Sequence, residues 1–514
     1  MPMMMRTCGV LGIVAAISLG LLVGCSSSSG FTPSGNPLLD LRNPGLLERD
    51  RIIAAEAAWA EVEAGVRVRE RTRTALKNLA WSNATGSALR MTALELLMSD
   101  DSVEGEADSR AMARLLLPTE RSPEAVRILT DRAVESGWDE LVPALVRSFA
   151  RPSPNVPDGQ RDERAALLAL VPGVAIERIV FDVFLRPSSG AGDEREQSVL
   201  RSNQRTRDDA WGLLARLDPD GHVRRGFIDS IALTDVEESS RLVVADLREA
   251  KSQLGVMPDS AMEVEWLANL RRHPDERNER LNTQWWSETA AAVAMLNQEQ
   301  RDGLVLRHLE PIRWASQNRP GWTSLDRQGL FVVLSERLSR RVHHKRKHVK
   351  GEDPRKERLG DWADVLSWGD LISILVVDDA IGNPVVVEQL FTQRALDKKD
   401  TSTEYGGVIE EGGDLGFRAV LYRPRSRDRL SDERFVASDD MFRFSDRSLA
   451  HYHMHVNKRN NNNYAGPSMA DFFNASQSSR TNLVFTSLGK NELNVDLYLP
   501  SGAVIDLGQI EQVK

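Results

Sequence analysis

The sequence predicts a multidomain protein in which an all-α, α-solenoid-like region precedes a smaller α/β domain with a mostly antiparallel sheet. Three observations lead to this prediction. Apolar residues recur at helical spacing from about Leu46 to Arg341. Turn signals divide that stretch into segments of helix length, which is typical of stacked antiparallel helices. After about Trp362 the pattern changes, and short segments such as Leu493–Leu499 alternate in polarity as strands do.

The first residues, 1–24, resemble a signal peptide rather than part of the fold. An apolar run from Gly9 to Gly24 is too short to span a bilayer comfortably. It ends in Leu22-Val23-Gly24-Cys25, which resembles the lipobox of bacterial lipoprotein precursors. The resemblance implies that Cys25 is acylated and anchors the chain in a membrane of the cell envelope, facing outside the cytoplasm. Ser26 gives no sign of inner-membrane retention, so an outer membrane is expected where one exists. A plain signal peptide cut elsewhere is the alternative.

Composition excludes some classes of protein. Cys8 lies in the expected signal peptide and Cys25 would carry lipid, so the mature chain has no disulfide and needs an ordinary core. Its 41% of apolar residues supply one. Removing Arg6, the single charge in Met1–Gly24, changes the formal net charge from −9 to −10. An acidic, exported protein is a poor candidate for binding nucleic acid, and we expect no such partner.

Residues 25–45, rich in Ser, Pro, Gly and Asn, are expected to form a flexible tether. Residues 46–341 are expected to form the helical region. Within it, Ala75–Trp81 and Ala88–Leu97 resemble a degenerate HEAT-type helix pair, which favours an α-solenoid over an irregular bundle. We expect this region to bind a partner or substrate rather than to carry chemistry.

Residues 342–369 are expected to form a basic linker. The surrounding stretch Arg337–Arg358 is dense in Arg, Lys and His. It is either a solvated loop or helix end between domains, or a patch for anionic lipid headgroups or an acidic partner. His343 and His344 are adjacent, so their side chains do not converge on one metal ion in a helix or strand.

Residues 370–514 are expected to form the α/β domain. A helical stretch over Asp370–Leu396 is broken near Gly382-Asn383-Pro384. A second helix is expected over Ser468–Ser476. The expected strands are Glu404–Ile409, Phe417–Tyr422, Leu449–Val456, Leu483–Thr486, Leu493–Leu499 and Ala503–Leu507.

Three histidines alternate along one of these strands, at His451, His453 and His455. Alternate side chains of a strand point the same way, so His453 and His455 can present their imidazoles to one metal ion. The spacing by itself is a weak signal, because such pairs also arise by chance on surface strands. Two further segments make it specific: Glu404 follows a helix, and Ser468-Met469-Ala470-Asp471 opens one.

With these segments in this order, the chain resembles the JAMM (JAB/MPN) metalloproteases over roughly residues 370–507. The resemblance implies a JAMM-like α/β fold and Zn²⁺ held by His453, His455 and Asp471, with a fourth position for water. It implies that Glu404 is the general base and that Ser468 donates a hydrogen bond to the oxyanion.

The chain also departs from the family pattern. Val456 stands where proline is usual, and the loop between the second histidine and Ser468 is longer than usual. The polar run Asn460–Asn463 accounts for the excess and is expected at a loop tip.

Alternatives remain for two of the assignments. His451 and His453 form a second His-x-His pair, one step upstream of the preferred one. Glu410 and Glu411 are alternative bases, both in an expected hairpin turn.

Two functions from different classes are therefore expected. The first is a membrane-anchored envelope zinc metallopeptidase, which hydrolyses peptide or isopeptide bonds of a protein or peptide bound by the helical region. The second is a non-enzymatic envelope scaffold lipoprotein with an inactive JAMM-like fold. A bound zinc ion with an open coordination position distinguishes the two, because a scaffold does not require one.

Overall fold

The computed structural model describes residues 34–187, 196–344, 356–431, 434–457 and 465–512. The predicted signal peptide, the lipidation site Cys25 and the polar run Asn460–Asn463 lie outside these ranges. Within them, no helix combines the length and the apolar character needed to cross a membrane.

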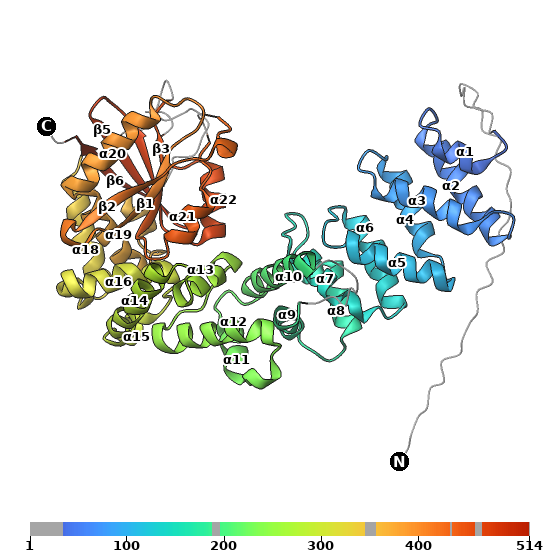
Figure 1. Ribbon diagram of the computed structural model, residues 1–514, viewed down its shortest axis with the longest axis horizontal. Coiled ribbons are helices and arrows are strands. Elements are labelled where there is room, and N and C mark those ends of the chain that lie inside the picture. Colours follow the sequence, from blue (N-terminus) through green and yellow to red (C-terminus); the bar gives the residue numbers. More distant parts are fainter. Residues whose placement is uncertain (1–33, 188–195, 345–355, 432–433, 458–464, 513–514) are drawn as a thin grey trace, which may run out of the picture. The chain divides into compact units, whose positions relative to one another are not determined.

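The described chain is mostly helical and ends in a mixed six-stranded sheet (Figure 1). Its α-helices are α1 (Pro37–Arg42), α2 (Glu48–Glu63), α3 (Arg69–Trp81), α4 (Ser87–Met98), α5 (Val103–Leu116), α6 (Pro123–Glu135), α7 (Val142–Ala150), α8 (Asp162–Leu170), α9 (Ile176–Leu185), α10 (Glu196–Leu217), α11 (His222–Ser230), α12 (Glu238–Glu249), α13 (Ala261–Arg271), α14 (Glu276–Ala294), α15 (Gln298–Arg301), α16 (Leu306–Asn318), α17 (Pro320–Thr323), α18 (Arg327–Ser339), α19 (Trp368–Ile381), α20 (Pro384–Asp397), α21 (Asp439–Phe444) and α22 (Met469–Ser478). Its strands are β1 (Gly406–Glu411), β2 (Phe417–Tyr422), β3 (Ala450–His455), β4 (Asn482–Ser487), β5 (Glu492–Tyr498) and β6 (Val504–Glu511). The predicted order, a helical region followed by an α/β region, is confirmed.

Backbone contacts divide the chain into two compact units, one ending at Ser109 and one beginning at Arg110. In the first unit, α1 packs on α2 and α3 packs on α4. Arg73 of α3 is buried in this unit, with Nη1 2.7 Å from Asp100 Oδ2 and Nη2 2.9 Å from Asp108 Oδ2. Pairing on both sides compensates for taking the guanidinium out of water.

Helix α1 lies where the sequence predicted a flexible tether. The side chain of Asn36 accepts a hydrogen bond from the Leu38 amide at 3.2 Å, and Pro37 occupies the first helical turn, where its missing N–H is not needed. Leu38 and Leu41 are buried. The prediction for this segment was wrong because a capped start and two core leucines outweigh its loop-like composition.

In the second unit, α16 and α18 both pack against α19, one of the two helices that directly precede the sheet in sequence. Arg337 of α18 and Arg341 just after it each lie 2.6 Å from a carboxylate oxygen of the buried Asp378 on α19. These two arginines of the basic stretch therefore hold helices together rather than forming a solvated helix end. Residues 345–355 of that stretch lie outside the described ranges.

The helix predicted to break near Gly382 does so. Asn383 caps α20, its side chain accepting from the Val385 amide at 2.9 Å, and Pro384 begins the new helix. This places α19 and α20 as two separate helices ahead of the sheet.

The strand order in the sheet is β2-β1-β3-β4-β5-β6. Strands β3 and β4 run parallel, and every other neighbouring pair is antiparallel, as the predicted mostly antiparallel sheet requires. Parallel neighbours need a crossover connection, and α22 supplies it. In Figure 1 the sheet lies between α20 and α22. The crossover brings the start of α22 close to the end of β3.

Candidate metal centre

Strand β3 places its histidines on the sheet face that α22 partly covers. His451, His453 and His455 are all buried on this face. The alternate residues Tyr452 and Met454 are buried on the other face, where the Tyr452 hydroxyl donates a hydrogen bond to Gln393 of α20. This anchoring fixes the rotation of β3 and thereby the direction of its imidazoles.

Glu404 lies two residues before β1, and not on the strand that the sequence predicted. Its neighbour Tyr405 fixes its position from two sides. The Tyr405 amide donates to Asp397 Oδ2 at 3.1 Å, and the Tyr405 carbonyl accepts from the Met454 amide at 2.9 Å. The Glu404 side chain is therefore held beside β3 without belonging to a regular ladder.

Asp471 lies in the first turn of α22, where the sequence predicted it. Ser468 is the N-cap of this helix, and its amide donates to Asp471 Oδ2 at 2.7 Å. The Asp471 amide donates back to Ser468 Oγ at 3.4 Å, which completes a capping box. With Oδ2 held in this way, Asp471 Oδ1 faces His453 Nε2 at 3.5 Å.

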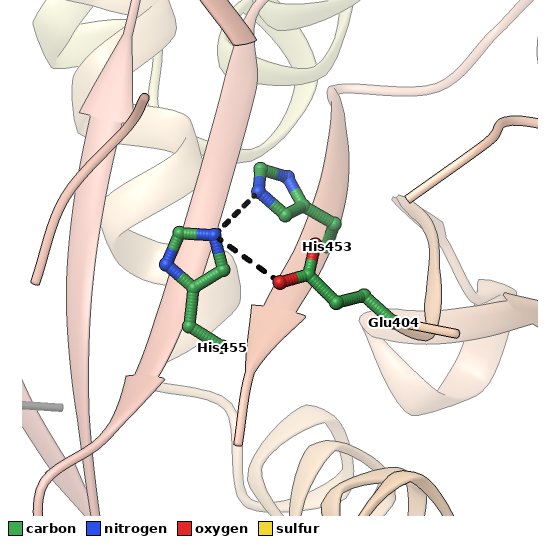
Figure 2. A group of neighbouring side chains, drawn as sticks. All are labelled: Glu404, His453 and His455. Atoms are coloured by element: carbon green, nitrogen blue, oxygen red, sulfur yellow. Dashed lines mark hydrogen bonds and ion pairs between the residues drawn. The ribbon is translucent and has the colours of Figure 1, made fainter. Parts of the chain in front are cut away.

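The imidazoles of β3 and the two carboxylates converge on one small volume. The Nε2 atoms of His453 and His455 lie 3.1 Å apart, and Glu404 Oε1 lies 3.8 Å from His455 Nε2. Figure 2 shows the three side chains pointing toward one another. Two ligands about 2.0–2.1 Å from a tetrahedral zinc ion are about 3.3 Å apart. The buried group of Glu404, His453 and His455 can hold a metal ion, with Asp471 beside it.

The charges of this group are coupled. Burial alone would lower the pKa of His453, but the carboxylates of Asp471 and Glu404 outweigh burial and raise that pKa. Burial alone would raise the pKa of Asp471, whereas His453 and the hydrogen bonds from Ser468 bring that pKa well below its usual range. Asp471 is thus an anion, ready to act as an oxygen ligand, at any pH near neutrality.

Two aromatic residues that the sequence did not predict, Tyr498 and Phe435, border the centre. The ring of Tyr498, at the end of β5, lies 6.4 Å from that of His453. Burial, with Asp471 and Glu404 adding to it, raises the pKa of the Tyr498 phenol well above its usual value, so the hydroxyl stays a neutral donor. The Phe435 ring stacks on His453 at 5.8 Å and 7°.

Gly406 makes room for that stacked ring. A β-carbon at this position would lie 2.5 Å from the Phe435 ring and would also meet the Tyr452 carbonyl. The sequence pattern offered no signal for Phe435, which lies in a loop. Tyr498 could have been found only by knowing that β5 lies two strands from β3.

The alternative residues are engaged elsewhere. His451 Nε2 lies 3.0 Å from Ser445 Oγ, and burial together with Arg480 lowers the pKa of His451 well below its usual value. Glu410 and Glu411 lie on β1 rather than in the predicted turn. Each lies 2.5 Å from an arginine, Arg418 and Arg313 respectively.

Comparison with models of protein families, with curated proteins and with solved structures finds no match for this chain. Its function must therefore be argued from the geometry of this centre.

Proposed function

We propose that the chain is a zinc-dependent hydrolase of peptide or isopeptide bonds, of the JAMM-like type. In this proposal Cys25 anchors it in the cell envelope, and the helical region presents a protein or peptide substrate. The observation that carries the proposal is the buried group of Glu404, His453 and His455, whose ligand atoms lie within 4.8 Å of one another, with Asp471 Oδ1 3.5 Å from His453 Nε2.

The donor set suits zinc. Two imidazole nitrogens and one carboxylate oxygen are the ligands of many catalytic zinc sites, which keep a further position open. We assign His453, His455 and Asp471 as ligands, because Asp471 Oδ1 is 3.5 Å from His453 Nε2, close to the separation of two ligands on one ion. When bound, zinc would acidify water and polarise the substrate carbonyl.

Glu404 is the proposed general base. Its carboxylate lies 3.8 Å from His455 Nε2, a longer separation than that of Asp471 from His453. In this role it accepts a proton from the attacking water and passes it to the leaving amine, so that the proton balance closes over one turnover.

Ser468 has two proposed tasks. Its Oγ accepts from the Asp471 amide, which orients the first turn of α22. A hydroxyl has one donor hydrogen and two acceptor lone pairs, so in this proposal the hydrogen that Ser468 directs at the Asp471 carboxylate turns to the oxyanion of the tetrahedral intermediate.

The test uses the purified full chain, with zinc measured by mass spectrometry and cleavage measured on fluorescence-quenched peptides. We expect about one zinc ion per chain. Glu404→Gln should retain the zinc while turnover falls by roughly 10²–10⁴-fold, the usual contribution of a general base.

Glu410→Gln is the matched control, since Glu410 is paired with Arg418 away from the centre, and it should change neither readout. The enzyme proposal fails if the wild-type chain shows no zinc-dependent cleavage, or if Glu404→Gln cleaves as fast as wild type. A non-enzymatic scaffold is then the better description.

A further inference from the structure

A cavity of about 370 Å³ opens directly beside the candidate metal centre. His453 and Asp471 form part of its wall, so it adjoins the position where a scissile carbonyl would lie. Its remaining walls come from α13, from the segment around Phe435, from α21 and α22, and from residues of β3, β4 and β5. It is therefore built by elements that lie far apart in the sequence.

Apolar and aromatic side chains form one side of the cavity: Met262, Phe435, Met441, Phe442 and Tyr498. Polar side chains form the other side: Asn474, Gln477 and Ser478 of α22, and Asn482 of β4. The acidic residue of the wall, Asp471, faces His453, and the basic one, Arg434, is exposed to solvent. The apolar side of the cavity favours contact with an uncharged hydrophobic group, and its polar side offers hydrogen-bonding partners to the backbone that carries that group.

The wall contributed by α13 is held firmly against the sheet region. Trp266, one turn along α13 from Met262, donates from Nε1 to the Asp446 carbonyl at 2.8 Å. The buried Arg480 guanidinium lies 3.4 Å from the centre of the Trp266 ring. Residues four apart share a helix face, so this anchor fixes Met262 in the cavity wall.

A second cavity continues from the first and shares Met262, Phe442 and Ser478 with it. Its walls carry charges of both signs, including Glu265, Asp439 and Arg443. An apolar pocket that leads into a polar groove suits a polypeptide, which places a side chain in the pocket and its polar backbone along the groove.

We propose that the cavity beside His453 and Asp471 receives a large apolar side chain of a polypeptide substrate, next to the bond that is cleaved, and that Met262 sets its depth. This inference rests on the proposed hydrolase function. It makes α13, a helix about 190 residues from the metal ligands in sequence, a determinant of specificity.

The cleavage test uses the zinc-loaded full chain and quenched peptides that differ only at one residue flanking the cleaved bond, set to Ala, Leu, Phe or Lys. The kcat/KM for Leu or Phe should exceed that for Ala and Lys at least tenfold, as a fitted apolar pocket provides. Met262→Trp fills the pocket and should lower kcat/KM for Leu and Phe at least tenfold while leaving Ala within about twofold.

Met295→Trp is the matched control, because Met295 is 73% exposed and lies outside both cavities. It should leave the profile unchanged. Cleavage without a preference for apolar residues, or a preference that Met262→Trp does not alter, overturns the pocket assignment while the hydrolase function stands.

A binding measurement tests the pocket when no cleavage is found. Fluorescein-labelled pentapeptides with a central Phe or Ala are titrated into the Glu404→Gln chain by anisotropy. The Phe peptide should bind at least tenfold more tightly, and Met262→Trp should remove the difference. Equal affinities, or no binding of either peptide, overturn the pocket independently of the enzyme proposal.

Discussion

Among the buried groups of the second unit that combine histidine with carboxylate, the pair that joins two helices and the candidate metal centre are built differently. The pair joins α16 to α19. There His308 Nε2 lies 2.9 Å from Asp370 Oδ1, and His308 Nδ1 accepts from the Val305 amide at 3.3 Å. Both ring nitrogens are thus used. Asp370 also accepts from Arg307 at 2.9 Å and from the Ser367 amide at 3.0 Å.

In the candidate metal centre the side-chain atoms are spaced differently. Two imidazole nitrogens, of His453 and His455, approach each other at 3.1 Å, and the nearest carboxylate oxygens stand off at 3.5 and 3.8 Å. The latter separations exceed ordinary hydrogen bonds. The 3.5 Å separation of Asp471 from His453 is close to that of two ligands on one ion, and Glu404 lies somewhat farther off, as its proposed role as base requires. We therefore interpret the His308–Asp370 pair as a structural contact and the group around His453 as a candidate metal site.

The pKa values of the histidines in the two groups also shift in opposite directions. Burial lowers the pKa of His308, so its imidazole is neutral and donates through Nε2 to Asp370. Burial by itself would raise the pKa of Asp370, but His308, Arg307 and Ser367 bring it well below its usual range. His453, in contrast, has a raised pKa because two carboxylates face it. A bound cation would relieve that accumulation of negative charge.

Replacing the histidine of each group by alanine should produce the largest difference in zinc content between two variants. His453→Ala should abolish zinc binding, whereas His308→Ala should leave the zinc content unchanged. His308→Ala should instead lower the free energy of unfolding by about 2–3 kcal/mol, since a hydrogen bond to a buried charged group is lost. Zinc analysis and denaturant unfolding of both variants check this. Loss of zinc in His308→Ala would break the comparison.

Substitutions at Ser468 separate its capping role from its role as a donor. Ser468→Asp retains an oxygen acceptor for the cap but cannot donate when ionised. We expect kcat to fall about 10²–10³-fold in both Ser468→Asp and Ser468→Ala, as on loss of an oxyanion donor. Only Ser468→Ala should also destabilise α22, by about 1 kcal/mol. Steady-state kinetics and thermal unfolding measure the two effects, and full activity of Ser468→Asp would exclude the donor role.

Chelation should lower the stability of the wild-type chain and of His308→Ala equally. At free zinc 100 times the dissociation constant, binding stabilises the folded state by about 2.7 kcal/mol. The thermal midpoint should fall on adding a chelator and recover on adding zinc. His453→Ala should show neither change. A midpoint of wild type that does not respond to zinc contradicts the metal centre.

Substitution of Glu263 on α13 should give the smallest effect, a change in the free energy of unfolding that depends on pH. Burial, reinforced by Asp259, raises the pKa of Glu263 to about 7 from an ordinary 4.5. Between these values the unfolded chain releases a proton that the folded chain keeps, so the free energy of unfolding falls as pH rises. Above about pH 7 it levels off.

Glu263→Gln removes this dependence. The variant should be more stable than wild type by about 1–3 kcal/mol at pH 8, with the difference vanishing near pH 4.5. Its zinc content should match wild type. Unfolding curves at the two pH values measure this, and a variant less stable at pH 8 would show that ionised Glu263 is held by its partners instead.

Local sequence signals predicted much of the sheet region. The period-two pattern of Leu493–Leu499 corresponds to β5, and Asn383 with Pro384 marked the break between α19 and α20. The residues that the sequence assigned to the candidate metal centre, His453, His455 and Asp471, lie near one another, and strand alternation and the helix cap that place them are local rules.

Features set by packing between distant segments could not be predicted. Glu404 lies off the strand because Asp397 and Met454 hold its neighbour. The strand order of the sheet places Tyr498 at the site, a loop places Phe435 there, and the distant helix α13 places Met262 there. None of these placements leaves a pattern in the sequence. Long-range contacts of this kind carry no periodicity.

The parallel pairing of β3 with β4 also bears on the order in which the protein is assembled. His455 and Asp471 approach the same volume only after α22 has crossed over the sheet, and Glu404 only after β1 has docked on the other edge of β3. An ion bound by all of these side chains would therefore be held tightly only once these elements have come together. Under the proposed function, the ions present in the compartment where the chain completes its fold would then decide which metal the centre takes.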